Sequence, residues 1–279
     1  MPRHVNALED VLRERAPDIL NSLRQGLPEG EVRRLLERFE YDVPDELIAM
    51  YAWHDGSEFV NDQDRAELFP GAQMLPLADA LEKMIEGRKA DQAHDPPGWQ
   101  PGWLPIFVGY QWKYWAADCA RPGVPVVTFD WLDLPETWLA HRTFDLMLET
   151  ITRCWRIGAY RVGRNATVIE NRKAVAAINR ELDTEPVDID RLVADLGSTD
   201  NPTHSHAIGM LRTRLYPEAV PALIAMLDTD SPGRIAAVEL LGEIGDSAAL
   251  AKLRSVADDY PDKLLRDYAR HTLAERTEE

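Results

Sequence analysis

The sequence predicts an α+β domain over residues 1–157, with a mainly antiparallel sheet and flanking helices, followed by an all-α domain over residues 166–279. Two observations support this division. The spacing of apolar residues changes from a helical to a strand period near residue 57, and back again near residue 143. Beyond residue 187 one pattern recurs about every 30 residues, which is typical of stacked helix pairs.

The first 50 residues have the apolar periodicity of helices. One stripe begins at Val5, and Pro17 suits the first turn of a second helix that we expect to end at Gly26. Further helices are expected over residues 30–41 and from Pro44 to an Asp-Gly turn signal at residues 55–56. The last of these helices should bury Leu47, Ile48, Met50 and Tyr51.

From about residue 57 the segments become short, aromatic and β-branched, with Pro and Gly between them. We expect a strand and a turn in residues 68–77, and one sheet formed by the strands within residues 103–108, 114–119 and 124–132. Helices are expected at residues 80–90 and 144–155, and residues 157–165 have the composition of a linker.

The internal repeat begins at Leu192, and equivalent leucines follow 31 and then 30 residues later, at Leu223 and Leu253. Each unit consists of a helix, an acidic turn that ends in Pro, and a second helix. One such pair cannot bury its apolar face alone, so the pairs must stack. The side chains expected between them are Leu223, Leu227, Val238 and Leu241.

The formal net charge is −17, and it is shared evenly along the chain. Residues 1–165 contain 27 acidic and 18 basic residues, and the remainder contains 21 and 13. Such a chain should be repelled by nucleic acid and by anionic membranes, and attracted to basic proteins. A highly soluble acidic protein without such a partner is the alternative explanation.

The sequence favours a cytoplasmic protein. Its start is charged and lacks the apolar core of a secretory signal. No stretch approaches the roughly 18 apolar residues of a membrane helix. Cys119 and Cys154 are the only cysteines, and we expect both to be buried free thiols.

No known catalytic motif occurs: P-loop, GxSxG, HExxH and Rossmann glycine patterns are all missing. His204 and His206 would point about 200° apart on a helix, so they cannot share one ion. The carboxylates of residues 58–67 do not have the spacing of an EF-hand loop. We therefore expect no metal, no cofactor and no enzymatic activity, and an enzyme with an unrecognised site stays an alternative.

The segment PALIAMLDTDSPGRIAAVELLGEIGDSAAL resembles a HEAT-like repeat of the short bacterial type, and looser units flank it over residues 187–275. The resemblance implies an architecture and no particular chemistry.

The first 155 residues resemble the SUKH superfamily of bacterial immunity proteins and fungal cell-wall-assembly regulators. The resemblance rests on the order of YDVPDELIAMYAWHDGSE, LFPGAQMLPLADALE, GWLPIFV, YWAADC and TFDLMLETI, with Asp118 at the usual acidic position. Asp55 stands where the family often has Asn, and the stretch from Glu86 to Pro101 is longer than the family needs. The resemblance implies a protein that neutralises a toxin by direct binding; a scaffold or regulatory role of the cell-wall type is the alternative.

A cluster of aromatic residues lies near the acidic segments and is explained either by core packing or by a protein-binding site. Trp99, Trp103, Tyr110, Trp112, Tyr114 and Trp115 fall within 17 positions. Aromatic anchors ringed by acid suit the binding of a basic protein, such as a toxin domain with a basic nuclease groove. The residues predicted to bind this partner are Glu58, Asp62, Asp64, Glu67, Trp112, Tyr114, Asp130 and Asp133.

Overall fold

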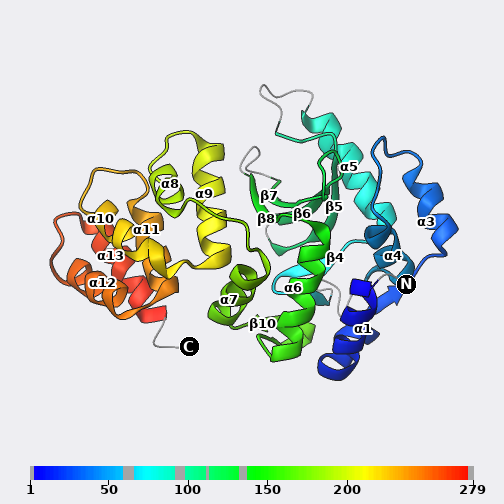
Figure 1. Ribbon diagram of the computed structural model, residues 1–279, viewed down its shortest axis with the longest axis horizontal. Helices are drawn as coiled ribbons and strands as arrows, with labels where there is room; N and C mark the ends of the chain where they lie inside the picture. The colour runs from blue at the N-terminus through cyan, green and yellow to red at the C-terminus, as the bar shows by residue number, and fades with distance from the viewer. Residues whose placement is uncertain (1–2, 59–65, 92–97, 111–112, 132–136, 276–279) are drawn as a thin grey trace. The chain divides into compact units, whose positions relative to one another are not determined.

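A computed structural model describes residues 3–58, 66–91, 98–110, 113–131 and 137–275 of the chain. The chain divides into two compact units, Met1–Ile178 and Asn179–Glu279. The first contains an antiparallel sheet with flanking helices, and the second is a helical stack (Figure 1). The fold class predicted from the sequence is therefore confirmed. Within the described residues, no helix has both the length and the apolar character that crossing a membrane requires.

The sheet of the first unit has the strand order β3-β4-β5-β6-β7-β8, and each strand is antiparallel to its neighbours. Helix α5 (Leu77–Asp91) connects β4 to β5 and packs against β5. The strands are β3 (Glu67–Phe69), β4 (Ala72–Met74), β5 (Trp103–Val108), β6 (Lys113–Asp118), β7 (Val126–Asp130) and β8 (Thr137–His141).

The register of the sheet aligns rows of side chains across β5 to β8. Directly opposed residues of antiparallel strands share a face of the sheet. One row contains Phe107, Trp115, Thr128 and Trp138. The next row contains Val108, Tyr114, Phe129 and Thr137, on the other face. Alternation along β6 therefore separates Tyr114 from Trp115, as its sequence predicts.

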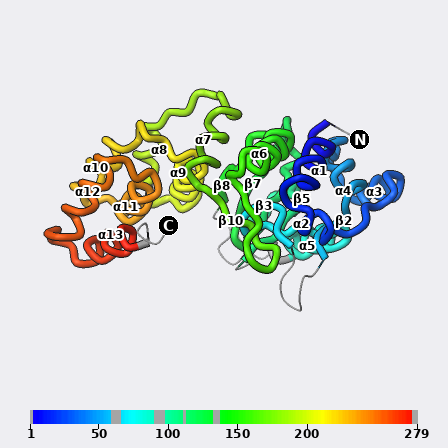
Figure 2. Tube along the Cα trace, turned by 90° about the horizontal axis from the view of Figure 1, so that it is seen from below, coloured from blue at the N-terminus to red at the C-terminus, as the bar shows by residue number. Residues whose placement is uncertain are grey.

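Three helices pack against one another beside this sheet: α1 (Arg3–Arg15), α4 (Asp45–Trp53) and α6 (Phe144–Ile157). Helices α1 and α6 run side by side (Figures 1 and 2). Helix α6 begins where the Thr143 hydroxyl accepts a hydrogen bond from the Leu146 N–H, 3.0 Å away. Their buried side chains include Leu8, Leu12, Leu47, Met50, Met147, Leu148 and Ile151.

The helix expected to continue to Gly26 ends earlier. Helix α2 (Pro17–Asn21) stops at Ser22, whose backbone N–H and hydroxyl both donate to the Ile19 carbonyl. The chain then forms β1 (Leu23–Gln25), which pairs with β2 (His54–Ser57). The Asp-Gly sequence read as a turn lies inside β2, with Gly56 at φ +86°. Helix α3 (Glu29–Leu36) follows β1.

The segment with a linker composition contains part of a hairpin. Strand β9 (Tyr160–Val162) pairs with β10 (Val168–Glu170), and β10 also contacts β3. Helix α7 (Arg172–Leu182) follows, and the division between the two units falls within it, after Ile178. The domain boundary predicted near residues 157–166 thus falls inside a region that packs with the first unit.

The second unit consists of helix pairs that correspond to the sequence repeats. Helix α8 (Ile189–Asp195) packs on α9 (Asn201–Arg214), α10 (Val220–Leu227) on α11 (Arg234–Ile244), and α12 (Ser247–Asp259) on α13 (Lys263–Glu275). Contacts of α11 with α9 and α13 join successive pairs. The core residues predicted from the repeat, Leu223, Leu227, Val238 and Leu241, are all fully buried.

A close helix contact and a left-handed helix end explain two glycines of the stack. A Cβ at Gly242 in α11 would lie 2.0 Å from the Thr272 methyl group of α13, so glycine allows these helices to approach. Gly245 ends α11 at φ +56°, a left-handed conformation that favours glycine. Gly242 therefore allows α11 and α13 to pack closely, and Gly245 allows the chain to leave α11 before the next repeat begins.

Candidate functional site

Of the residues predicted to bind a partner, the four that the structure describes do not form one exposed surface. Glu58 is exposed directly after β2, and Asp130 is half-buried at the end of β7. Glu67 and Tyr114 are buried. Asp62, Asp64, Trp112 and Asp133 lie outside the described residues.

Glu67 is a buried residue that stabilises the fold of the first unit. Its side chain is in β3, and the residue is 3 % exposed. One carboxylate oxygen accepts hydrogen bonds from the N–H of Gly71 at 3.1 Å and of Val168 at 2.8 Å. The acidic segment of the sequence suggested a solvated residue, but the buried N–H of Val168 and the half-buried N–H of Gly71 hold this carboxylate inside the unit. Glu67 is therefore not available as a surface contact in this structure.

Tyr114 is likewise part of the core. Its ring stacks on Phe129, with ring centroids 5.6 Å apart, and lies 5.7 Å from the ring of Trp131. Trp99 and Trp103 contact the same Phe129 ring. Burial raises the pKa of the Tyr114 hydroxyl, and the nearby Lys83 charge opposes the shift. For Tyr114, Trp99 and Trp103, core packing is the correct explanation of the aromatic cluster.

The opposite face of the sheet has a more accessible aromatic group that the sequence reading missed. Trp115 and Trp138 are half-buried, and the Lys113 ammonium lies 5.1 Å and 5.0 Å from their ring centroids. Phe69 meets Trp115 edge-on at 5.3 Å. The parity of Lys113 and Trp115 was visible in the sequence. Their proximity to Trp138 depends on the register of β8, which the sequence does not specify.

Asp55 and Asp118, two acidic residues of the segments that resemble the SUKH pattern, have structural roles. The Asp55 carboxylate accepts a hydrogen bond from the Leu77 N–H at 2.8 Å, at the start of α5. Asp118 is buried and accepts from the Ala120 N–H at 3.2 Å. Both carboxylates are buried and accept hydrogen bonds from backbone N–H groups of the first unit, so neither forms an exposed binding residue.

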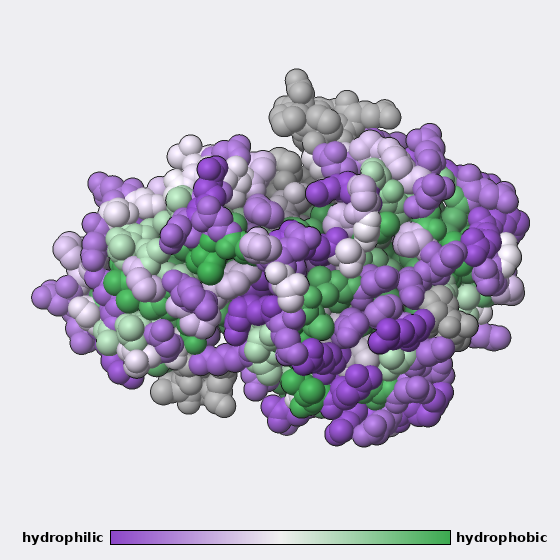
Figure 3. Space-filling view, viewed as in Figure 1, coloured by the Kyte–Doolittle hydropathy of each residue, from purple (hydrophilic) through white to green (hydrophobic). Residues whose placement is uncertain are grey.

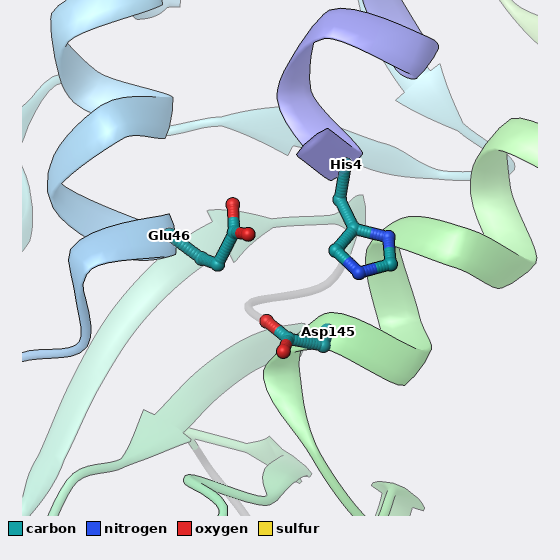
Figure 4. Close-up of side chains that lie close together, drawn as sticks. All are labelled: His4, Glu46 and Asp145. Atoms are coloured by element: carbon teal, nitrogen blue, oxygen red, sulfur yellow. The ribbon is translucent and has the colours of Figure 1, made fainter. Parts of the chain in front are cut away.

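Three side chains with metal-ligating atoms converge at one end of the helices α1, α4 and α6. His4, Glu46 and Asp145 place one such atom each within 4.8 Å of the other two (Figure 4). Glu46 and His4 are half-buried, and Asp145 is exposed. Burial raises the pKa of Glu46, the Asp145 charge raises it further, and His4 opposes this shift. The sequence reading missed this group because its members are far apart along the chain.

Among the described residues, His204 and His206 of the repeat region belong to no group of three metal-ligating side chains. His204 is half-buried, and its Nδ1 lies 2.7 Å from the Leu196 carbonyl oxygen. His206 is exposed two residues later. Cys119 and Cys154 are buried free cysteines, and burial raises the pKa of each thiol to about 12.

The acidic turns of the repeats lie along one edge of the second unit. The turn after α8 lies against the turn after α10. The two are so close that a Cβ at Gly197 would lie 2.9 Å from the Ser231 hydroxyl oxygen. The Tyr260 hydroxyl in the next turn donates to the Leu227 carbonyl. The aspartates of this edge are Asp195, Asp200, Asp228, Asp230, Asp258, Asp259 and Asp262. We call this row the aspartate edge.

Helix capping and ion pairs account for part of the aspartate edge. Asp200 accepts hydrogen bonds from the Thr203 hydroxyl and from the Thr203 N–H at the start of α9, and both lower the pKa of its carboxyl group. Lys252 pairs with Asp228 at 2.8 Å. Asp230, Asp258 and Asp259 are exposed. On the face seen in Figure 3, hydrophilic residues predominate, with smaller hydrophobic patches between them.

A family model for HEAT repeats matches residues 189–274, which cover the helix pairs of the second unit. Repeat stacks of this kind present extended surfaces to other proteins. No family match supports the SUKH resemblance of the first unit. No curated protein matches the chain in the comparison made.

Proposed function

We propose that this protein is a non-enzymatic binding protein whose ligand is a basic protein. The observation that carries the proposal is the stack of HEAT repeats, an architecture used to hold other proteins. The net charge of −17 supports a basic partner, because complementary charge accelerates association and disfavours acidic competitors. The same charge disfavours nucleic acid and anionic membranes as ligands.

The finer proposal is immunity: the chain would neutralise a cognate toxin by covering its active site. The immunity proposal rests on the resemblance of the first unit to SUKH proteins. We further propose that the protein acts in the cytoplasm. A nuclease is a suitable toxin because its substrate groove is basic. A scaffold of the cell-wall-assembly-regulator type is the alternative, for which the same binding architecture would serve.

The first unit stays the proposed interface, through Glu58, Asp62, Asp64, Trp112, Asp130 and Asp133. Glu67 and Tyr114 no longer belong to this set, since both are buried. The aspartate edge of the second unit is the competing interface, because Asp230, Asp258 and Asp259 are exposed there.

The test is affinity capture with the full-length chain from the native host at low salt, followed by identification of the captured protein. We expect a basic protein that is released as the salt concentration rises. The purified partner is then assayed for toxic activity with increasing amounts of the chain. Loss of activity at an equimolar ratio supports immunity, whereas binding without loss of activity favours the scaffold. A partner that is acidic and insensitive to salt would contradict the charge argument.

A further inference from the structure

His4, Glu46 and Asp145 of the first unit form a group of side chains with ligating atoms that the proposed function does not use. Each comes from a different helix: His4 from α1, Glu46 from α4 and Asp145 from α6. The three side chains point toward a common space between the helices (Figure 4). Residues that are 42 and 99 positions apart along the chain are thus brought together only by the packing of these helices.

The environment of Glu46 is unusual for a residue in the first turn of a helix. Carboxylates are common there because the amide dipoles favour negative charge. Such carboxylates normally keep contact with water or with a backbone donor. One oxygen of Glu46, Oε2, is inaccessible to solvent and has no hydrogen-bond partner in the described residues. Since Asp145 brings a second negative charge close to the Glu46 carboxylate, a cation is the ligand that would relieve both defects.

His4 has the arrangement of a histidine that ligates a metal. Its Nδ1 lies 3.7 Å from a carboxylate oxygen of Glu149, one turn along α6 from Asp145. A histidine ligand usually directs one ring nitrogen to a carboxylate or carbonyl group and the other to the metal. The second ring nitrogen of His4 lies on the side of the ring nearer to Asp145 (Figure 4). Glu149 therefore lies close enough for a small movement of its side chain to orient the ring through Nδ1.

We propose that His4, Glu46 and Asp145 bind one divalent transition-metal ion, with Zn²⁺ as the best match. One imidazole and two carboxylates suit zinc, whereas Ca²⁺ and Mg²⁺ prefer sites made of oxygen ligands. Bonds of about 2.0–2.1 Å to a tetrahedral zinc place neighbouring ligand atoms about 3.4 Å apart. The exposed side chain of Asp145 can rotate to close the remaining separation, and a water molecule would complete the coordination.

The ion would cross-link the helices α1, α4 and α6, because each supplies one ligand. It binds the folded state, in which the three ligands are together, and not the unfolded chain. Zn²⁺ should therefore raise the temperature of unfolding in a concentration-dependent way. This inference concerns the first unit alone and does not depend on the proposed partner.

The test uses the full-length chain without a histidine tag, freed of metal by a chelator and then titrated with Zn²⁺ in a calorimeter. We expect saturable uptake of one ion per chain and a rise in the unfolding temperature. His4→Ala, Glu46→Gln and Asp145→Asn should each lose the uptake and the rise. Glu46→Gln keeps the shape of the side chain, so its fold is expected to persist, as far-UV circular dichroism can verify.

The control variants are His206→Ala and Asp267→Asn, which change an exposed histidine and an exposed aspartate of the second unit. Both should bind Zn²⁺ like the unaltered chain. Uptake that survives in all of the site variants would overturn the proposal, and so would a chain that shows no saturable uptake. Preference for Mg²⁺ or Ca²⁺ over Zn²⁺ would overturn the assignment to a transition metal.

Discussion

The carboxylate of Glu67 in β3 accepts a hydrogen bond from the backbone N–H of Val168 in β10, although the two residues are 101 positions apart. The same carboxylate oxygen accepts from the Gly71 N–H in the turn between β3 and β4. One acidic side chain thus joins two hairpins of the first unit. This contact explains why the chain after residue 157, which the sequence suggested as a linker, packs with the first unit.

Replacement of Glu67 by Ala should destabilise the first unit by about 1.5–3 kcal/mol, the range for hydrogen bonds to a charged group. The change leaves the buried N–H of Val168 and the half-buried N–H of Gly71 without an acceptor, so a loss within this range is expected. Urea unfolding measures the loss, and hydrogen exchange at the Val168 amide reports the local effect. Glu67→Gln keeps one acceptor oxygen and should cost less; an equal cost for both variants would contradict this role.

Leu241→Ala in α11 should cost about 2–5 kcal/mol, because the side chain is fully buried between the helix pairs. Leu264→Ala is the matched control, since Leu264 in α13 is 55 % exposed. Its effect should stay within about 0.5 kcal/mol. Chemical denaturation of both variants makes the comparison. A loss well under 1 kcal/mol at Leu241 would show that the stack is packed differently.

The buried ion pair of Asp183 with Arg214 should be sensitive to loss of one partner. Both side chains are almost inaccessible, at 5 % and 2 % exposure. Asp183→Asn leaves the guanidinium in a buried position without its counter-charge, so we expect a loss of about 3–5 kcal/mol. Adding Arg214→Met should recover part of this loss, because the uncompensated charge is removed. Asp267→Asn in the exposed pair with Arg270 is the control, and its effect should be near zero.

The two cysteines should be protected in the folded protein. Burial raises the pKa of the Cys119 and Cys154 thiols from 9.0 to about 12. Near neutral pH the folded thiols stay protonated, so a thiol-specific reagent should react slowly until urea unfolds the chain. The unfolded thiols release their protons near pH 9, so the stability linked to these groups is complete below that pH and falls as the pH rises toward 12. Fast labelling of either cysteine in the folded protein would contradict this picture.

The helical repeat was predictable because its signal is redundant. The apolar pattern around Leu223 and Leu241 recurs in successive helix-pair repeats, and the apolar stripe of each helix specifies which side is buried. Strands β5 to β7 of the sheet were also found, since they are rich in aromatic and β-branched residues. Strands β1, β2, β8, β9 and β10 were missed. Strands β1 and β2 are short and polar, and they pair with each other across about 30 positions. Strands β9 and β10 form a hairpin of three-residue strands, too short for a strand period to be recognised.

The candidate sites were less predictable for a related reason. The spacing of Tyr114 along β6 is compatible with either face of the sheet being covered, and only the packing on Phe129 decides. Glu67 looked solvated because its buried donor, the Val168 N–H, comes from a distant part of the chain. The group of His4, Glu46 and Asp145 has no sequence signal at all, because three helices supply one ligand each.

The last prediction identifies which unit holds the partner, once one has been captured. Two matched charge reversals are compared: Asp62→Lys with Asp64→Lys in the first unit, and Asp258→Lys with Asp259→Lys on the aspartate edge. Each changes the net charge by the same amount, so a general effect of charge would be equal in both. We expect the first pair to slow association about tenfold at low salt, because charges near an interface steer the encounter.

The slowing should shrink at 1 M salt, where the screening length falls to about 3 Å. Trp112→Ala should instead shorten the lifetime of the complex at either salt concentration, as loss of an aromatic anchor acts mainly on dissociation. Surface-immobilised binding kinetics at the two salt concentrations measure both rates. A larger effect of the Asp258 and Asp259 reversal would move the interface to the repeats. Unchanged rates in every variant, with the fold intact, would contradict an acidic interface in either unit.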